Sequence, residues 1–322
     1  MLCEFYYAGL SFLGSSMRIL AIGGAGFIGC QVIGRLVAQG HVVHVPTRQF
    51  QYDHELLVHP TVTMMQADIH DDATLERLVA GCDIVLNFVG ILHSREGQPY
   101  GADFERAHVQ LPHRIAQACH THQVKRFIHI SALGADLQGP SGYLRSKAAG
   151  ERAIRNSYAV PGAGDFTIFR PSVVFGPDDK FMNMFAKLAR FLFVLPIAGA
   201  HAKMQPVYVG DVATAMMTVL TLPVAANKTY DLAGPRVYTL GELVKLAALW
   251  SGHPRMVLNL PLSVGRLQAR IFECLPGEPL LTRDNLASLS VDNVTNEPAD
   301  SELNLVVTPL ESVAPIYLKR GK

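Results

Sequence analysis

The stretch GGAGFIG, Gly23 to Gly29, follows the apolar run RILAI, Arg18 to Ile22, and leads into a segment with helical periodicity. Its glycines have the spacing GxxGxxG: Gly23 permits a tight turn, Gly26 lets the backbone approach a pyrophosphate, and Gly29 lets the helix pack closely on the sheet. The start of that helix offers N–H donors and a favourable dipole to a phosphate. A strand, this loop and a helix, in that order, predict a dinucleotide-binding site, with a ligand-free glycine-rich turn as the alternative. The expected contacts are Gly23, Gly26, Phe27, Ile28 and Gly29.

Helices and strands alternate downstream of the loop as far as residue 131. We expect helices at 27–40, 72–82 and 104–122, and strands at 18–22, 41–45, 62–68, 83–90 and 126–131. Asp72 is expected to cap the second helix. Because the strands are almost continuously apolar, the sheet should be parallel and covered by helices on both faces. The sequence therefore predicts an α/β fold with a doubly wound, Rossmann-type parallel sheet.

Beyond about residue 178 the alternation weakens. Further strands are expected at 205–209 and 229–234, Asp211 is expected to cap the helix after the first, and TLGE, Thr239 to Glu242, is a capping box. We assign residues 17–178 to the dinucleotide-binding domain, with 204–234 returning to it. Residues 179–322 form a smaller, mostly helical substrate lobe, and residues 1–16 an N-terminal extension.

The composition excludes several classes of protein. Of 322 residues, 49% are hydrophobic and 17% are charged, which supplies a large core and argues against disorder. The 28 Lys and Arg residues nearly balance 27 Asp and Glu, so the chain lacks the basic excess with which nucleic-acid binders neutralise phosphates. Five scattered cysteines fit a reducing, cytoplasmic location rather than a disulfide scaffold. None of the 13 histidines has a recognised ligand spacing, so we expect no metal site.

The end of the second strand bears on the choice of cofactor. A ribose-binding acid often stands at this position, but here the sequence has Thr47 and Arg48. A guanidinium can pair with a 2′-phosphate, which a carboxylate would repel. We therefore expect NADP(H) to be preferred, with NAD(H) possible if Arg48 is only a solvated side chain.

Tyr143 and Lys147 lie four residues apart in SGYLRSKAAGE and so share one face of a helix. An ammonium close to a phenol lowers the phenol pKa and makes it a usable acid or base, and it can also hold ribose hydroxyls. Ser131 ends the fifth strand, where its hydroxyl can orient a substrate carbonyl. We predict Tyr143, Lys147 and Ser131 as catalytic residues, with an ordinary i,i+4 pair as the alternative.

Two apolar segments bear on membrane association. Residues 1–16 contain no Lys or Arg, as a secretory signal would require, and their apolar stretch is too short to span a bilayer. Residues 185–200 are strongly apolar but include Lys187 and Arg190. The segment packs on the domain as a helix and loop, or it forms a patch that touches a membrane surface or a partner.

The chain resembles an extended or atypical short-chain dehydrogenase/reductase. GGAGFIG, Asp68-Ile69, NFVG, Ser131, Tyr143 with Lys147, and RPSVVFGP occur in that family's order. More narrowly, the chain is similar to the Rossmann-fold, NAD(P)H-binding accessory subunit of respiratory complex I and its bacterial relatives. The segments that carry this resemblance span nearly all of the chain from Met17: KRFIHISALGAD, YLRSKAAGE, RPSVVFGPDDKFMNMFAKLAR, MQPVYVGDVATAM and GEPLLTRDNL.

The resemblance implies roles for further residues. Asp68 and Ile69 would flank the adenine, and Val89 and Gly90 would line the adenosine ribose and the phosphates. Pro171 and Val173 would contact the nicotinamide side. The family often has NNAG after the fourth strand, where this chain has NFVG, a departure typical of atypical members. In the complex I subunit the resemblance implies a cofactor held structurally rather than turned over.

Three functions remain open at this point. The first is an oxidoreductase that transfers a hydride between the nicotinamide and a carbonyl or alcohol of a small molecule that the sequence does not identify. The second is a non-catalytic NADPH-binding accessory or assembly protein, and the third is a sugar-nucleotide epimerase or dehydratase. Intact Ser131, Tyr143 and Lys147 favour the enzyme.

Overall fold

A seven-stranded parallel sheet forms the centre of the computed structural model, which describes residues 16–48, 54–277, 279–297 and 300–320. The strand order is β11-β6-β5-β4-β1-β2-β3, so the chain runs outward from β1 in both directions. This confirms the α/β fold with a doubly wound parallel sheet. The strands are β1 (Arg18–Ile22), β2 (Val42–Thr47), β3 (Val62–Gln66), β4 (Ile84–Asn87), β5 (Arg126–Ile130), β6 (Asp165–Pro171) and β11 (Lys228–Leu232).

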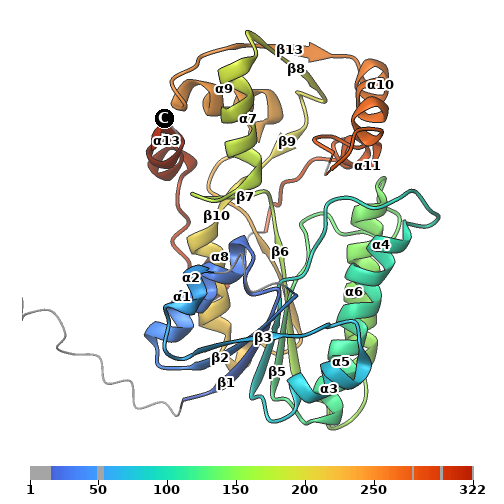
Figure 1. The fold of residues 1–322 in the computed structure, drawn as a ribbon, viewed down its shortest axis with the longest axis vertical. Coiled ribbons are helices and arrows are strands. Elements are labelled where there is room, and N and C mark those ends of the chain that lie inside the picture. Colours follow the sequence, from blue (N-terminus) through green and yellow to red (C-terminus); the bar gives the residue numbers. More distant parts are fainter. Residues whose placement is uncertain (1–15, 49–53, 278, 298–299, 321–322) are drawn as a thin grey trace, which may run out of the picture.

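Helices cover both faces of the sheet because alternate residues of each buried strand point to opposite sides. In β1, Ile19 and Ala21 belong to the core under α1 and α8, whereas Leu20 and Ile22 belong to the core under α3, α5 and α6. Figure 1 shows these two helical layers on either side of the strands. The helices are α1 (Phe27–Ala38), α3 (Asp72–Val79), α5 (Leu111–Thr121), α6 (Gly142–Ser157) and α8 (Val209–Val219).

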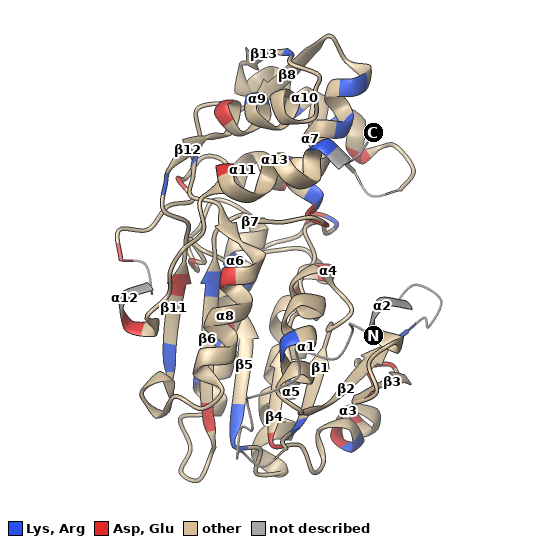
Figure 2. Ribbon diagram, turned by 90° about the vertical axis from the view of Figure 1, so that its left-hand side faces the viewer, with Lys and Arg blue, Asp and Glu red and all other residues tan. Residues whose placement is uncertain are grey.

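A second, smaller body lies beyond the carboxyl end of the sheet. Its core is formed by α7 (Lys180–Phe191), α9 (Leu240–Trp250) and α13 (Leu310–Arg320). Short strands outside the central sheet lie within and next to this body: β7 (Val174–Phe175), β8 (Val194–Ala198), β9 (Lys203–Met204), β10 (Val207–Tyr208), β12 (Tyr238–Thr239) and β13 (Met256–Leu260). Figures 1 and 2 both show β8, β13 and α10 (Leu262–Glu273) at the end farthest from the sheet. Short helices complete the described residues: α2 (His54–Leu57), α4 (Ala102–Phe104), a π-helix (Glu105–Gln110), a 3₁₀ turn (Pro223–Ala225), α11 (Arg283–Ser288) and α12 (Asp300–Leu303).

Several local predictions need correction. The residue that caps α3 is Asp71, whose side chain accepts a hydrogen bond from the Thr74 N–H, so the prediction of Asp72 is wrong by one residue. Asp211 does not cap α8, which begins after Tyr208. Instead, its carboxylate accepts hydrogen bonds from the Thr308 N–H (2.6 Å) and hydroxyl (2.9 Å) and so ties the C-terminal segment to the sheet domain.

One local prediction is confirmed. The capping box at Thr239 and Glu242 is present at the start of α9. Within residues 204–234, α8 packs on one face of the sheet, and β11 belongs to the sheet because it pairs with β6. The second strand is longer than expected and extends to Thr47. Of residues 1–16, all but Ser16 lie outside the described residues.

Candidate dinucleotide-binding site

The glycine loop leaves the N-terminus of α1 open to an anion. Gly23 has a φ of +73°, the left-handed backbone that favours glycine in a tight turn. Gly26 is the N-cap of α1, no side chain caps this end, and the first turn contains no acidic residue. The first N–H groups of the helix therefore carry a partial positive charge without a carboxylate competing for them. A pyrophosphate fits this position chemically.

The third glycine packs α1 onto the loop. A methyl group at Gly29 would lie only 2.6 Å from the Cα of Gly24. Gly24 is equally constrained, because a methyl group there would lie 2.8 Å from Cδ1 of Ile33. Sequence reasoning assigned no role to Gly24, although the doubled glycine of GGAG was the signal. By contrast, a methyl group at Gly26 meets only the Gly23 carbonyl oxygen, at 3.3 Å, so this position stays open on its other sides.

The end of β4 lies directly beside the loop. A methyl group at Gly23 would lie 3.0 Å from a methyl carbon of Val89, which places the predicted ribose and phosphate residues Val89 and Gly90 next to the glycine turn. The Val89 N–H donates to the side-chain oxygen of Asn87 (3.1 Å), and this buried amide also contacts Nδ1 of His129 on β5 (3.1 Å). These polar contacts fix the chain as it leaves the sheet.

Lys147 lies between the ends of β4 and β5. Its ammonium donates to the Ile130 carbonyl oxygen (3.1 Å), and a methyl group at Gly90 would lie 3.2 Å from its Nζ. The side chain is only 3% exposed. Burial lowers the Lys147 pKa to about 8, against an opposing Coulombic effect of Glu151. The lysine is therefore placed beside the predicted cofactor residues, with a pKa close to neutrality.

Two buried imidazoles surround this lysine. Nε2 of His108 accepts the Ile91 N–H (3.0 Å), and Nδ1 of His108 contacts the Ser146 hydroxyl (2.9 Å). Burial, and secondarily the Lys147 ammonium, lower the pKa of His108 and of His129 well below the usual value. Both rings are neutral at pH 7, so Lys147 is the cation of this cluster.

Tyr143 stands one turn before Lys147 on α6. Its ring meets His108 and Phe104 edge-on, with ring centroids 5.6 and 6.1 Å away. Burial raises the Tyr143 pKa to about 12. The phenol therefore holds its proton at neutral pH in this arrangement, as a proton donor must, and its pKa lies above the usual value rather than below it as the neighbouring lysine led us to expect.

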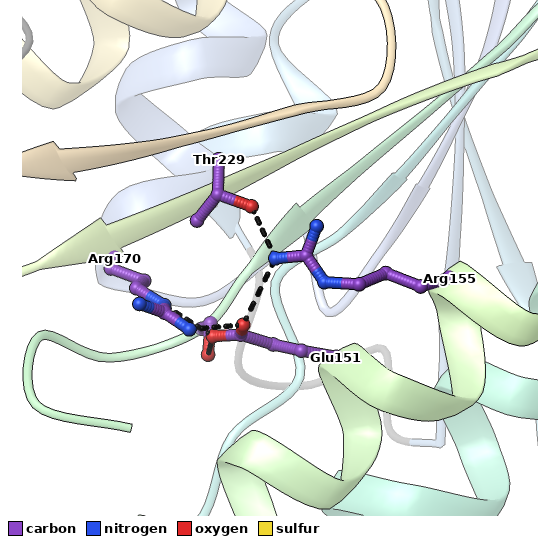
Figure 3. Close-up of polar contacts among 5 residues, drawn as sticks. Glu151, Arg155, Arg170 and Thr229 are labelled. Carbon is purple, nitrogen blue, oxygen red and sulfur yellow. Dashed lines mark hydrogen bonds and ion pairs between the residues drawn. The ribbon is translucent and has the colours of Figure 1, made fainter. Parts of the chain in front are cut away.

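Ser131 binds an ion cluster around the buried Glu151, whose arginine partners Arg155 and Arg170 are labelled in Figure 3. Its hydroxyl donates to Glu151 of α6 (2.6 Å), and Arg170 of β6 binds the same carboxylate through Nε (2.7 Å) and Nη2 (2.6 Å). Arg155 adds a longer contact of 3.5 Å and donates to the Thr229 hydroxyl of β11. Glu151 is 2% exposed, so this cluster fastens α6 to β5, β6 and β11. The structure thus brings Ser131 to Glu151, a partner that sequence reasoning missed.

The remaining predicted residues lie at strand ends and against the adjoining cores. Arg48 is exposed at the end of β2, close enough to His70 to contribute to the lowering of its pKa, for which burial is the main cause. Asp68 accepts the His70 N–H at the end of β3 (2.9 Å). The other predicted contacts are distributed as follows: Thr47 at the end of β2, Ile69 against the core under α3, Phe27 beside Gly176, Ile28 on the core under α1, Pro171 at the end of β6, and Val173 in the lobe core.

The family model of the NAD dependent epimerase/dehydratase family matches residues 19–240, more than half of the chain. The chain belongs to this family. It is 34% identical over 315 residues to the mouse (Mus musculus) protein NADH dehydrogenase [ubiquinone] 1 alpha subcomplex subunit 9, mitochondrial, covering 96% of this chain and 81% of that protein. It is also 28% identical over 251 residues to the ceramide reductase of Caulobacter vibrioides, covering 76% of this chain and 74% of the relative.

Solved structures share the fold of this chain. DesIV, a dTDP-glucose 4,6-dehydratase from Streptomyces venezuelae solved with NAD bound, has a TM-score of 0.75 and 20% identity, with 94% of this chain and 96% of that chain covered. MoeE5, solved with UDP-glucose and NAD, has a TM-score of 0.72 and 17% identity, with 94% and 99% covered. At these identities the likeness shows the shared fold. The edge described above is thus the carboxyl end of a sheet that two structures with bound NAD share.

Proposed function

We propose that the protein binds a nicotinamide dinucleotide across the carboxyl end of its sheet and acts as an oxidoreductase. The observation that carries the proposal is the uncapped N-terminus of α1 at Gly26, with Lys147 placed beside Gly90. The helix end would bind the pyrophosphate through its N–H groups. The Lys147 ammonium would donate to ribose hydroxyls.

The chemistry would divide between the cofactor and α6. When bound, the nicotinamide supplies hydride exchange at its C4 atom. Tyr143 would hold or donate the proton at the substrate oxygen, since its phenol keeps its proton at neutral pH. Ser131 can assist only through a lone pair or after rotation, because its proton points to Glu151.

We also propose that NADP(H) is the preferred cofactor. Arg48 is exposed at the end of β2. The adenosine ribose of the bound dinucleotide would lie at this strand end. Its guanidinium would pair with a 2′-phosphate there. The pairing has no counterpart in NAD(H).

The test of catalysis compares the wild type with Tyr143→Phe. The oxidation of NADPH is followed with a panel of quinones, aldehydes and ketones. An oxidoreductase should lose about 10²–10⁴-fold in turnover on the substitution, whereas its cofactor affinity should stay within a factor of about two, because the ring still packs. Wild-type turnover that the substitution leaves unchanged contradicts the role of Tyr143. The absence of turnover with every acceptor, together with tight NADPH binding, favours the second candidate.

The second candidate is a non-catalytic accessory role. Two observations favour it: Glu151 holds the Ser131 proton, and relatives that cover nearly the whole chain are named as subunits of NADH dehydrogenase. In this role the chain would contact a respiratory complex, at the inner face of a membrane, through residues 185–200. The helical part of that segment packs inward through Phe185, Ala186 and Ala189, so the contact would be made by the exposed turn 191–194.

A further inference from the structure

Helix α10 presents its large apolar side chains to the outside. Val264, Leu267 and Ile271, spaced i, i+3 and i+7, share one face and are 45%, 61% and 56% exposed. The opposite face carries Gly265 and Ala269, the two residues of α10 that are buried. The helix therefore packs on the lobe through its smallest residues and leaves its hydrophobic face without a partner among the described residues.

This face continues onto a neighbouring pair of strands. α10 lies against β8, since a methyl group at Gly265 would overlap the Cβ atom of Ala198. β8 pairs in parallel with β13, with Met256 opposite Val194. Phe193, in the turn before β8, is 83% exposed, and Met256 is 68% exposed. The turn 191–194, β13 and α10 together form one apolar region, which we call the outer lobe surface.

Positive charges predominate around the outer lobe surface. Residues 180–203 contain four Lys and Arg and no Asp or Glu, and the same holds for residues 243–272. Arg255 stacks its guanidinium over the ring of Phe193, at 5.2 Å from the centroid, and Arg266 and Arg270 lie beside the apolar face of α10. The acid at the end of α10, Glu273, is paired with Arg283 (2.8 Å). Figure 2 shows several Lys and Arg positions at this end of the molecule.

We propose that the outer lobe surface docks on a lipid bilayer that carries anionic headgroups. This deepens the contact proposed above for residues 185–200 and rests on it, by naming lipid as its chemistry. Apolar side chains flanked by arginines suit the boundary between acyl chains and headgroups, where the former insert and the latter meet phosphates. No helix in the described part of the chain is long and apolar enough to cross a membrane. The docking is therefore peripheral.

The charge pattern favours a bilayer over a second copy of the chain. Two copies that meet through this surface would bring arginines of both copies together without acidic partners, and like charges in a contact oppose association. An anionic bilayer offers negative charge to every arginine at once. Binding should accordingly weaken as salt rises, whereas a purely apolar contact would not.

The experiment measures flotation of the whole chain with vesicles of phosphatidylcholine, with and without phosphatidylglycerol, at low and high salt. Wild type should bind the anionic vesicles, and more weakly at high salt. Leu267→Gln with Ile271→Gln should weaken binding about tenfold, and so should Arg266→Gln with Arg270→Gln. Val160→Gln and Arg77→Gln, exposed on the sheet domain, are the matched controls and should bind as wild type.

The outcomes separate the surface from the proposed function. NADPH affinity, measured on the same samples, should be equal in the wild type and all variants. If none of these proteins binds NADPH, the result contradicts the proposed dinucleotide site and does not bear on the outer lobe surface. Binding by both double variants at the wild-type level contradicts the proposal, since binding would then not depend on the outer lobe surface. The proposal is also contradicted if the wild-type protein does not bind vesicles but sediments as a dimer, and if Leu267→Gln with Ile271→Gln dissociates that dimer.

Discussion

The Oδ2 atom of Asp284 accepts a hydrogen bond from the backbone N–H of Tyr143 (3.0 Å), and its Oδ1 atom accepts one from Gly142 (2.6 Å). Asp284 lies on α11 in the lobe, whereas Tyr143 is in the first turn of α6. A carboxylate at a helix N-terminus binds free N–H groups and favours the helix dipole. The lobe thus holds the start of the helix that carries Tyr143 and Lys147.

Removing this carboxylate should loosen the start of α6. Asp284→Ala is expected to lower the free energy of unfolding by about 1–3 kcal/mol, because two charge-assisted hydrogen bonds are lost. Chemical denaturation followed by circular dichroism measures the change. The control Asp178→Ala, at an exposed position, should shift the midpoint little. Equal effects of the two substitutions would show that Asp284 contributes nothing beyond an ordinary surface acid.

Replacing Glu151 should destabilise the fold more than replacing Asp284, because the guanidinium that Glu151 binds stays partly buried. Glu151→Gln leaves the half-buried guanidinium of Arg170 without the carboxylate that binds it directly, and breaking such a pair typically costs about 3–5 kcal/mol. Arg170→Gln combined with Glu151→Gln should be less destabilising than the two single effects added together. Additive losses in this double-mutant cycle would mean that the two side chains do not interact.

The pKa of Lys147 predicts how cofactor binding depends on pH. With a pKa of about 8, the free protein loses the ammonium as the pH rises through that value. NADPH binding should be nearly constant below pH 7 and should then weaken by up to about tenfold per pH unit above 8. Lys147→Met should bind more weakly and without this dependence, as titration calorimetry at several pH values can show. The same profile in both proteins would remove Lys147 from the site.

The unfolded chain holds the Lys147 proton up to a higher pH than the folded protein does. Its lysine titrates near the ordinary value of 10.5, so between about pH 8 and 10.5 the unfolded state binds more protons than the folded state. Stability from this group therefore rises with pH across that window. Without cofactor, Lys147→Met should lack this rise, which denaturation at pH 8 and pH 10 can measure.

Arg48 should discriminate between the two dinucleotides. Arg48→Ala is expected to weaken NADPH binding about ten- to hundredfold, because a charge-assisted pair contributes roughly 1.5–3 kcal/mol, while NADH binding stays nearly unchanged. Arg77→Ala, exposed on α3, is the control for a general loss of positive charge. If both dinucleotides lose affinity equally in Arg48→Ala, the residue does not read the 2′-phosphate.

Local signals made the sheet and the glycine loop predictable. RILAI gives β1 its bounds without error, and Gly23 has the left-handed φ that the motif requires, because both features depend on neighbours in the chain. The alternation of strands with helices gave the parallel sheet, and a side-chain pair three residues apart gave the capping box of α9.

The partners of the site residues were not predictable in the same way. The sequence analysis assigned Ser131 and Tyr143 to one site, but the direction of the Ser131 hydroxyl depends on Glu151 and on Arg170 of the next strand. Asp284 is about 140 residues away from α6 in the sequence, and no periodic pattern of residues indicates their contact. Such contacts follow from how the elements pack, which a pattern of apolar residues leaves undetermined.

The glycine loop separates binding from folding. A side chain at Gly26 enters open space, so Gly26→Val should fold normally and fill the place of the pyrophosphate. A side chain at Gly29 meets the backbone of Gly24, so Gly29→Val should unfold at a lower denaturant concentration. Denaturation of the two variants side by side tests this difference. A Gly26→Val protein destabilised as strongly as Gly29→Val would contradict the assigned geometry.

The dinucleotide site is tested most directly by titration calorimetry of NADPH into the wild type and into Gly26→Val at pH 7. We expect one site per chain in the wild type and no measurable binding in the variant, with both proteins equally folded by circular dichroism. Wild type that binds neither NADPH nor NADH, or a folded Gly26→Val protein that binds NADPH with wild-type affinity, would contradict the claim that the N-terminus of α1 holds the dinucleotide.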